Sequence, residues 1–115
     1  MLKIKRVYED PKRDDGTRFL VERLWPRGIR KEQLKMKAWL RDVSPSPDLR
    51  KWYSHDVTKW EEFQKRYWKE LEKNTESWQP ILDAAKSGNV TLLYSAKDVE
   101  HNSALVLKEF LEEKV

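Results

Sequence analysis

Residues 90–95 read Val-Thr-Leu-Leu-Tyr-Ser, a short apolar run with turn-forming residues on both sides. A run of this length is typical of a strand whose two faces are both buried. Strands of this kind occur in parallel sheets, because the crossover connections cover both faces of the sheet. We therefore expect residues 90–95 to be the central strand of a parallel sheet.

Two other strands are expected before this run. Residues 2–8 alternate apolar and polar side chains with the period of a strand. Residues 18–24 (Arg-Phe-Leu-Val-Glu-Arg-Leu) form the second strand, which Pro26 and Gly28 close. Residues 36–43 fit either a helix or a strand, and the sequence leaves this open.

Three helices are expected in the second half of the chain. The first, over 58–73, begins with a Thr-x-x-Glu capping box and carries apolar residues at helical spacing. The second, over 77–88, has Pro80 in its first turn and ends at Gly88 as a left-handed C-cap. The third runs from about residue 100 to the last residue, 115.

Strands that alternate with helices indicate an α/β fold. We predict a single small α/β domain over residues 1–115, with a mostly parallel sheet and helices on both faces. The length of 115 residues allows one hydrophobic core of useful size.

Composition excludes several classes of protein. The chain has no cysteine, which rules out disulfides, a thiol nucleophile and thiolate metal sites. With only two histidines, 46 residues apart, we predict no metal site and no cofactor. The apolar runs are too short to span a bilayer and the N-terminus is charged. We therefore expect a soluble, cytoplasmic protein without a membrane partner.

Charge is distributed unevenly along the chain. Residues 1–41 hold 13 Lys and Arg against 6 Asp and Glu, whereas residues 42–115 hold 11 against 14. Such asymmetry predicts a basic face that attracts phosphates, or two halves that attract each other. No run of five like charges is present, so there is no basic arm of the kind that wraps nucleic acid.

The first candidate site segment is Arg23-Leu24-Trp25-Pro26-Arg27-Gly28. Ligands collect beyond the carboxyl ends of the strands in open α/β sheets, and this segment follows the second expected strand. Arg23 shares a face with apolar strand residues, and Gly28 permits a turn that aims Arg27 back at the strand end. The alternative is a structural ion pair of these arginines with Glu22 or Asp42.

The second candidate segment runs from the end of the central strand to the last helix. Ser95, Lys97 and Asn102 lie in it, and the first amides of a helix favour anions. Asp98 offers an alternative, because its side chain could cap the helix instead. Arg50 is a further candidate for the charge of the ligand.

His55 and His101 are the candidates for moving a proton in this site. A histidine on the surface or at a helix entry is the alternative, and we favour it for His55. No serine–histidine–aspartate arrangement follows from the sequence.

Six tryptophans are present, and for all of them core packing is the favoured interpretation. Trp60, Trp68 and Trp78 lie on expected helices. Trp25, Trp39 and Trp52 flank the candidate segments, where stacking on a base or a sugar is the alternative.

Several of these segments together resemble the YeaO-like bacterial and archaeal proteins of the domain-of-unknown-function family 488. They are residues 23–28, then Leu49-Arg50-Lys51-Trp52 with His55-Asp56, then 92–98 and Glu100-His101-Asn102. The resemblance covers nearly the whole chain and implies an intracellular α/β domain without an established activity. In the broader family the late loop carries Cys and His. Here it carries Ser95 and Asn102, which argues against thiol chemistry.

Three hypotheses for the function follow. The first is a pocket at the carboxyl ends of the strands that binds a phosphate or nucleotide-like anion through Arg23, Trp25, Arg27, Arg50, Ser95, Lys97 and Asn102. The second, which we favour less, is a nucleic-acid-binding module that uses the basic N-terminal third. The third is a structural or interaction domain without catalysis. The sequence leaves open whether a reaction is catalysed and what the oligomeric state is.

Overall fold

The computed structural model describes all 115 residues and contains one sheet of four parallel strands. The strands are β1 (Leu2–Arg6), β2 (Thr17–Leu20), β3 (Ala38–Trp39) and β4 (Val90–Tyr94), in the spatial order β1-β4-β2-β3. Every residue of β4 is buried, and this strand pairs with β1 on one side and β2 on the other. The predicted central strand, the parallel sheet and the α/β fold are confirmed.

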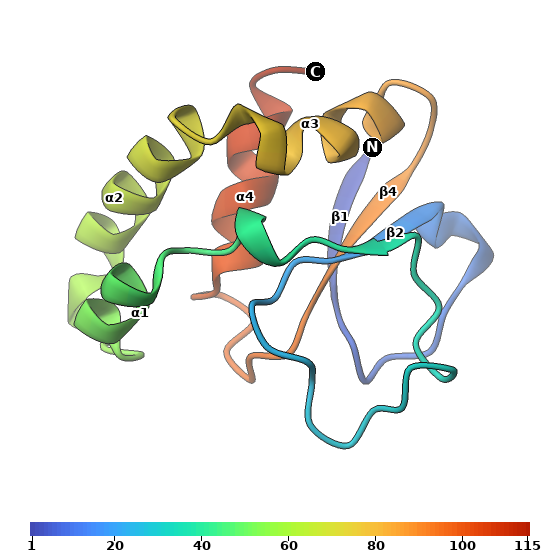
Figure 1. Cartoon of the computed structure of the whole chain (residues 1–115), viewed down its shortest axis with the longest axis horizontal. Helices are drawn as coiled ribbons and strands as arrows, with labels where there is room; N and C mark the ends of the chain where they lie inside the picture. The colour runs from blue at the N-terminus through green and yellow to red at the C-terminus, as the bar shows by residue number, and fades with distance from the viewer.

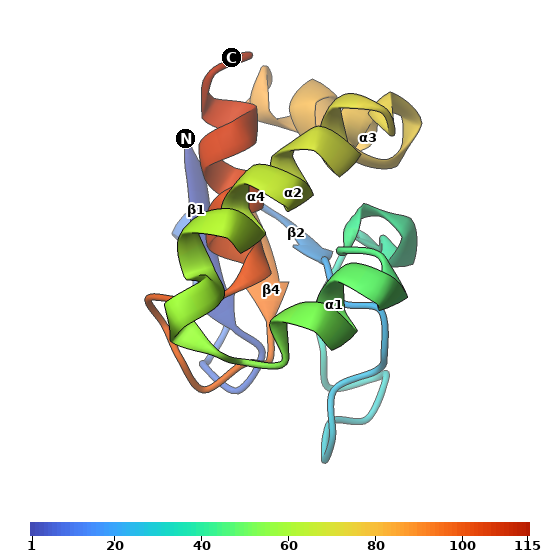
Figure 2. The same ribbon diagram turned by 90° about the vertical axis from the view of Figure 1, so that its left-hand side faces the viewer.

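Four helices cover one face of this sheet. They are α1 (Pro47–Tyr53), α2 (Trp60–Glu72), α3 (Thr75–Ala85) and α4 (Ser103–Glu112), and Figures 1 and 2 show their arrangement. Their apolar side chains share one core cluster with Phe19, Leu92 and Tyr94, which alternate onto that face of the strands. No helix is long and apolar enough to cross a membrane.

The opposite face of the sheet is covered by loops, which corrects the expectation of helices on both faces. Val7, Leu20, Leu34 and Leu93 form a second, smaller cluster there. The two connections, residues 7–16 and 21–37, each contain one Pro, one Gly and many charged residues, and neither forms the α-helix that is usual in a parallel crossover.

The second strand ends earlier than predicted. β2 stops at Leu20, although the apolar pattern continues to Leu24. Glu22 lies beyond the strand, and its carbonyl accepts a hydrogen bond from Trp39 Nε1 at 2.6 Å. As a result, Arg23 lies in a bend beyond the strand and not on a strand face. The open segment 36–43 contains β3, followed by a short 3₁₀ turn.

The boundaries of all three predicted helices also differ from the prediction. α2 is preceded by a 3₁₀ turn capped by Asp56, which accepts from Thr58 N at 3.0 Å, so the predicted capping box is not used. α3 begins at Thr75, which places Pro80 in its second turn. The backbone of Gly88 is not left-handed, and α3 ends at Ala85 with Lys86 as its C-cap. α4 begins later than expected, with Asn102 as its N-cap.

The tryptophans pack against apolar residues, as the favoured interpretation predicts. Trp78 is buried, and Trp60, Trp68 and Trp52 are partly buried against the main core. Trp25 and Trp39 pack edge to face in the second cluster, with ring centroids 5.3 Å apart.

Candidate functional site

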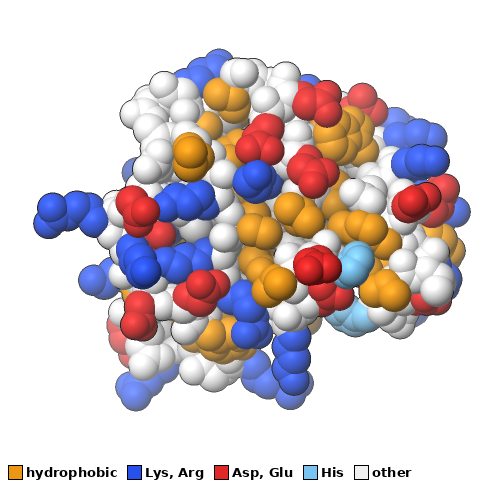
Figure 3. Space-filling view, turned by 180° about the vertical axis from the view of Figure 1, so that it is seen from behind, with side chains coloured by type: hydrophobic (Ala, Val, Ile, Leu, Met, Phe, Trp, Pro, Cys, Tyr) orange, Lys and Arg blue, Asp and Glu red, His pale blue; other side chains and the backbone are white.

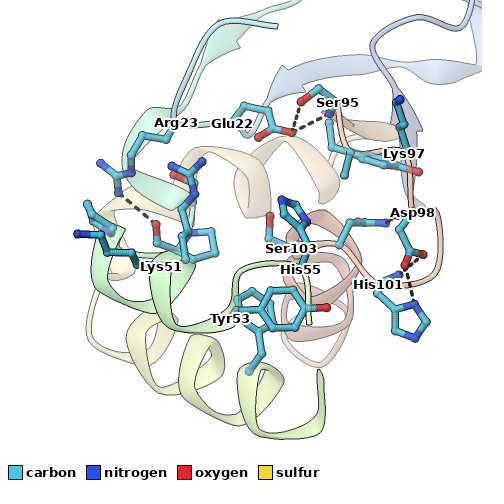
Figure 4. A pocket seen from close by; sticks show the side chains of 18 of the residues that line it. Glu22, Arg23, Lys51, Tyr53, His55, Ser95, Lys97, Asp98, His101 and Ser103 are labelled. Atoms are coloured by element: carbon cyan, nitrogen blue, oxygen red, sulfur yellow. Dashed lines mark hydrogen bonds and ion pairs between the residues drawn. The ribbon is translucent and has the colours of Figure 1, made fainter. Parts of the chain in front are cut away.

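A cavity of about 890 Å³ lies beyond the carboxyl ends of β2 and β4. One wall comes from the segment after β2 and from α1, and the other comes from residues 95–103 after β4. Figure 4 shows Arg23 and Lys51 on one side of the cavity and Ser95, Lys97 and Asp98 on the other. The location is the one in which open parallel sheets bind ligands.

Arg23 lines this cavity and carries an unsatisfied donor. Its Nε is buried and has no hydrogen-bond partner, and its only hydrogen bond is from Nη2 to the Pro45 carbonyl at 3.4 Å. It forms no ion pair with Glu22 or Asp42, the alternative that the sequence offered. The Glu22 carboxylate instead accepts from the backbone N and the hydroxyl of Ser95, at 2.7 and 3.1 Å.

Three further cations line the cavity, namely Arg50, Lys51 and Lys97. All three are exposed and none of them forms an ion pair. Arg50 and Lys51 lie on α1, which Ser46 caps by accepting from Leu49 N at 3.2 Å. The Ser46 hydroxyl also donates to a carboxylate on α2, and this bond holds α1 in place. The cavity therefore combines one partly buried guanidinium with three exposed, unpaired cations.

Ser95 and Asn102 lie at the cavity, but their polar groups are already used. Ser95 donates to Glu22, and the Asn102 side chain accepts from Leu105 N at 2.9 Å as the cap of α4. The amides of Glu100 and His101 both donate to Asp98, at 2.9 and 3.0 Å. Of the amides that the sequence suggested as an anion site, those of Glu100 and His101 are thus bound by Asp98, and that of Leu105 is bound by Asn102.

His101 and His55 also line the cavity, in different environments. His101 Nδ1 lies 2.9 Å from an Asp98 oxygen, and its ring meets Trp60 edge to face at 5.2 Å. Hydrogen bonds from the Glu100 amide and from His101 hold the pKa of the Asp98 carboxyl below its usual range, although partial desolvation opposes them. The His55 side chain is exposed and makes no hydrogen bond, and the backbone of this residue is in the left-handed region, with φ of 57°.

Trp25 and Arg27 lie outside the cavity. Trp25 Nε1 donates to the Ile29 carbonyl at 2.5 Å and its ring packs in the cluster on the other face of the sheet. Gly28 has the positive φ that the sequence predicts, at 78°, but the turn it makes leaves Arg27 exposed and away from the strand end. These two residues are therefore not part of the site proposed below.

Three aromatic residues that the sequence did not indicate complete the lining: Tyr53, Phe63 and Tyr94. Burial raises the pKa of both tyrosine hydroxyls, with smaller contributions from nearby carboxylates such as Asp98. Tyr94 could have been found, because it ends the central strand at the edge where the site was expected. No group of three or more histidine or carboxylate side chains is placed to hold a metal ion.

Comparison with known proteins places these features in one family. A family model described as "Inactive DUF488-N3 subclade" matches residues 1–115. The chain is 41% identical to "Uncharacterized protein YeaO" of Escherichia coli (strain K12), over 96% of each chain. It is 52% identical over 54 residues to "Uncharacterized protein Rv3073c" of Mycobacterium tuberculosis (strain ATCC 25618 / H37Rv), covering 47% of this chain and 46% of the relative. No solved structure matches.

Proposed function

Because the chain belongs to the YeaO-like DUF488 proteins, in the branch described as the inactive DUF488-N3 subclade, we propose that it binds a ligand without converting it. The proposed ligand is a small anion that carries a phosphate or a similar group, and the proposed site is the cavity beyond β2 and β4.

The observation that carries this proposal is the buried Nε of Arg23. Buried polar groups in native proteins are almost always hydrogen-bonded, so a partnerless guanidinium N–H beside a cavity points to an external acceptor. Guanidinium groups bind phosphate through two parallel hydrogen bonds, and these charge-assisted bonds are stronger than neutral ones. Arg50, Lys51 and Lys97 would add charge around the same ligand.

The size and lining of the cavity favour a ligand larger than inorganic phosphate. Its volume of about 890 Å³ lies within the usual range for small-molecule sites. Tyr53, Phe63 and Tyr94, which are 7%, 3% and 4% exposed, contribute a small aromatic area to its lining. A nucleotide-like molecule, with a planar ring at one end and a phosphate at the other, suits this combination best.

Binding without turnover agrees with the hydrogen bonds in the cavity. Covalent catalysis requires a nucleophile in hydrogen-bond contact with a base. The Ser95 hydroxyl donates to Glu22 and not to a histidine, and neither His55 nor His101 contacts a hydroxyl group. His101 instead holds Asp98, which orders the loop after β4.

The test measures the binding of 5′-AMP and of inorganic phosphate by calorimetry, with amide NMR shifts as a second readout. Arg23→Gln removes the unsatisfied donor and should weaken 5′-AMP binding by about 10- to 150-fold, the range for a hydrogen bond to a charged group. Arg13→Gln is the matched control, because Arg13 is exposed, forms no ion pair and lies outside the cavity.

The control variant should bind 5′-AMP like the wild type, and the amides of residues 95–102 should shift when the ligand is added. Equal affinities of the wild type and Arg23→Gln, with no movement of those amides, would show that the arginine has only a structural role.

A further inference from the structure

The chain between β2 and β3 is unusually long for a connection without secondary structure. β2 ends at Leu20 and β3 begins at Ala38, and residues 22–37, here called the basic loop, contain neither helix nor strand. Loops of this length inside a compact domain are uncommon and usually serve a function. Figure 1 shows the basic loop in cyan at the lower edge of the molecule, away from α2 and α3.

The basic loop holds the excess positive charge of the protein. It contains six Lys and Arg and two Glu, a net charge of +4 that equals the formal net charge of the whole chain. Five of its cations are exposed and none of these five forms an ion pair. They are Arg27, Arg30, Lys31, Lys35 and Lys37. Figure 3 shows Lys and Arg side chains projecting along the lower edge of the molecule.

The backbone of the basic loop is fixed by side chains that bind its carbonyl groups. The buried Arg18 donates from Nε to the Lys35 carbonyl at 2.6 Å, and Tyr8 donates from its hydroxyl to the Arg27 carbonyl at 2.9 Å. Leu34 is buried in the second apolar cluster. A loop held in this way presents its cations with little backbone entropy to lose on binding.

The basic loop begins at the proposed ligand site. Glu22 and Arg23 line the cavity, and the exposed cations follow from residue 27 onward. A polymer with regularly spaced phosphates could therefore contact the basic loop while one of its units enters the cavity. A free mononucleotide would use the cavity alone.

We propose that the basic loop binds the phosphate backbone of a single-stranded nucleic acid, one nucleotide of which enters the cavity. This inference rests on the proposed function, since the cavity supplies the site for the nucleotide. Proteins that bind single-stranded nucleic acid usually combine cations that follow its phosphate backbone with aromatic side chains on which its bases stack. A membrane surface fits less well, because the basic loop has no amphipathic helix and Leu24 is its only strongly exposed large apolar side chain.

The experiment compares thymidine monophosphate with a 5′-phosphorylated oligothymidylate of about eight nucleotides, a length within the range covered by one small domain. Binding is measured by calorimetry for the first and by fluorescence anisotropy for the second. The loop variant carries Arg27→Gln, Arg30→Gln, Lys31→Gln and Lys35→Gln. The control variant carries four Lys→Gln changes at exposed, unpaired positions around α2 and α3, namely Lys65, Lys69, Lys73 and Lys86.

We expect the wild-type protein to bind the oligonucleotide more tightly than the mononucleotide. If about four phosphates are neutralised, its affinity for the oligonucleotide should fall about 50-fold between roughly 50 and 200 mM salt. The loop variant should lose this advantage and most of the salt dependence, yet bind the mononucleotide like the wild type. The control variant should keep the tighter binding of the oligonucleotide and its salt dependence.

Three results would overturn the inference: equal wild-type affinities for the two ligands, equal losses in the loop and control variants, or tighter binding to phosphatidylserine vesicles than to the oligonucleotide. Arg23→Gln separates this inference from the proposed function. If that variant binds the mononucleotide normally, the cavity proposal fails, and with it the entry of a nucleotide into the cavity. The behaviour of the loop variant with the oligonucleotide then decides the backbone contact by itself.

Discussion

Replacing Asp15 with Asn tests whether a buried charge cluster holds the first crossover of the chain onto the sheet. Asp15 is 2% exposed, and its carboxylate accepts from Lys5 Nζ at 3.1 and 3.2 Å, from Arg18 and from the Lys12 amide at 3.0 Å. Its carbonyl accepts from the hydroxyl of Thr91 on β4 at 2.8 Å. The cluster thereby joins the turn before β2 to β1, β2 and β4.

Asp15→Asn keeps the size of the side chain but leaves two cations without their counter-charge. Breaking a buried ion pair by removing one partner costs about 3–5 kcal/mol. Asp14→Asn is the matched control, since Asp14 pairs with Lys3 at 3.1 Å and its side chain is 71% exposed. An exposed pair of that kind contributes about 0–1 kcal/mol.

The assay is urea denaturation at neutral pH followed by circular dichroism. With a slope of about 1.5 kcal/mol/M, Asp15→Asn should lower the midpoint by about 2–3 M, and Asp14→Asn should lower it by less than about 0.7 M. Equal midpoints for the two variants would refute the reasoning, because they would show that the buried charge contributes no more than an exposed one.

Acid provides a second readout for the same cluster. Burial alone would raise the pKa of Asp15, but hydrogen bonds from the Lys12 amide, Lys5 and Arg18 outweigh it, so the pKa is lowered. A carboxyl group whose pKa is lowered by folding stabilises the protein fully at a pH above its pKa in the unfolded chain, which is about 3.9. This stabilisation is lost as the pH falls through the pKa in the folded protein. The wild type should therefore lose more stability than Asp15→Asn as the pH falls below about 4.

Two other substitutions test the packing. Gly16→Ala should cost about 3 kcal/mol or more, because φ is 66° and a Cβ would lie 2.1 Å from the Asn89 carbonyl oxygen. Gly28→Ala, with a φ of 78° but open space, should cost only about 1–2 kcal/mol, and equal losses in the two variants would contradict this. Trp78→Ala should cost about 3–5 kcal/mol through its cavity and the loss of the bond from Nε1 to the Leu71 carbonyl at 2.8 Å, as measured by urea denaturation. Wild-type stability in that variant would show that Trp78 is not a core residue.

The central strand was predictable because its apolar pattern has only one good explanation. Residues 90–94 are apolar on both faces apart from a single Thr, and a parallel interior strand buries both faces. The end of β2 was not predictable in the same way. The strand predicted from the sequence extends to Leu24, but β2 ends at Leu20 and the Glu22 carbonyl accepts from Trp39 instead. That bond joins residues 17 positions apart, which no local pattern reveals.

The place of the cavity was also predictable, since parallel strands that end at one edge bring their following loops together. The sequence could not tell which donors there remain free. The Ser95 amide donates to Glu22, 73 positions away, which no local pattern reveals, whereas the Glu100 and His101 amides donate to Asp98, the local acceptor that the sequence offered as an alternative. Arg27 shows the reverse case, because the sequence places it at the strand end but the side chain is exposed and does not line the cavity.

The pairing of the carboxylates explains how the cations of the cavity stay available to a ligand. Glu22 is bound by the Ser95 amide, and Asp98 is bound by the amides of Glu100 and His101. Backbone N–H groups thus satisfy two acids that would otherwise pair with Arg23 or Lys97, the nearest cations in sequence. An anion that enters the cavity does not have to break an internal ion pair before it binds. It also gives the Arg23 Nε the acceptor that the protein itself does not provide.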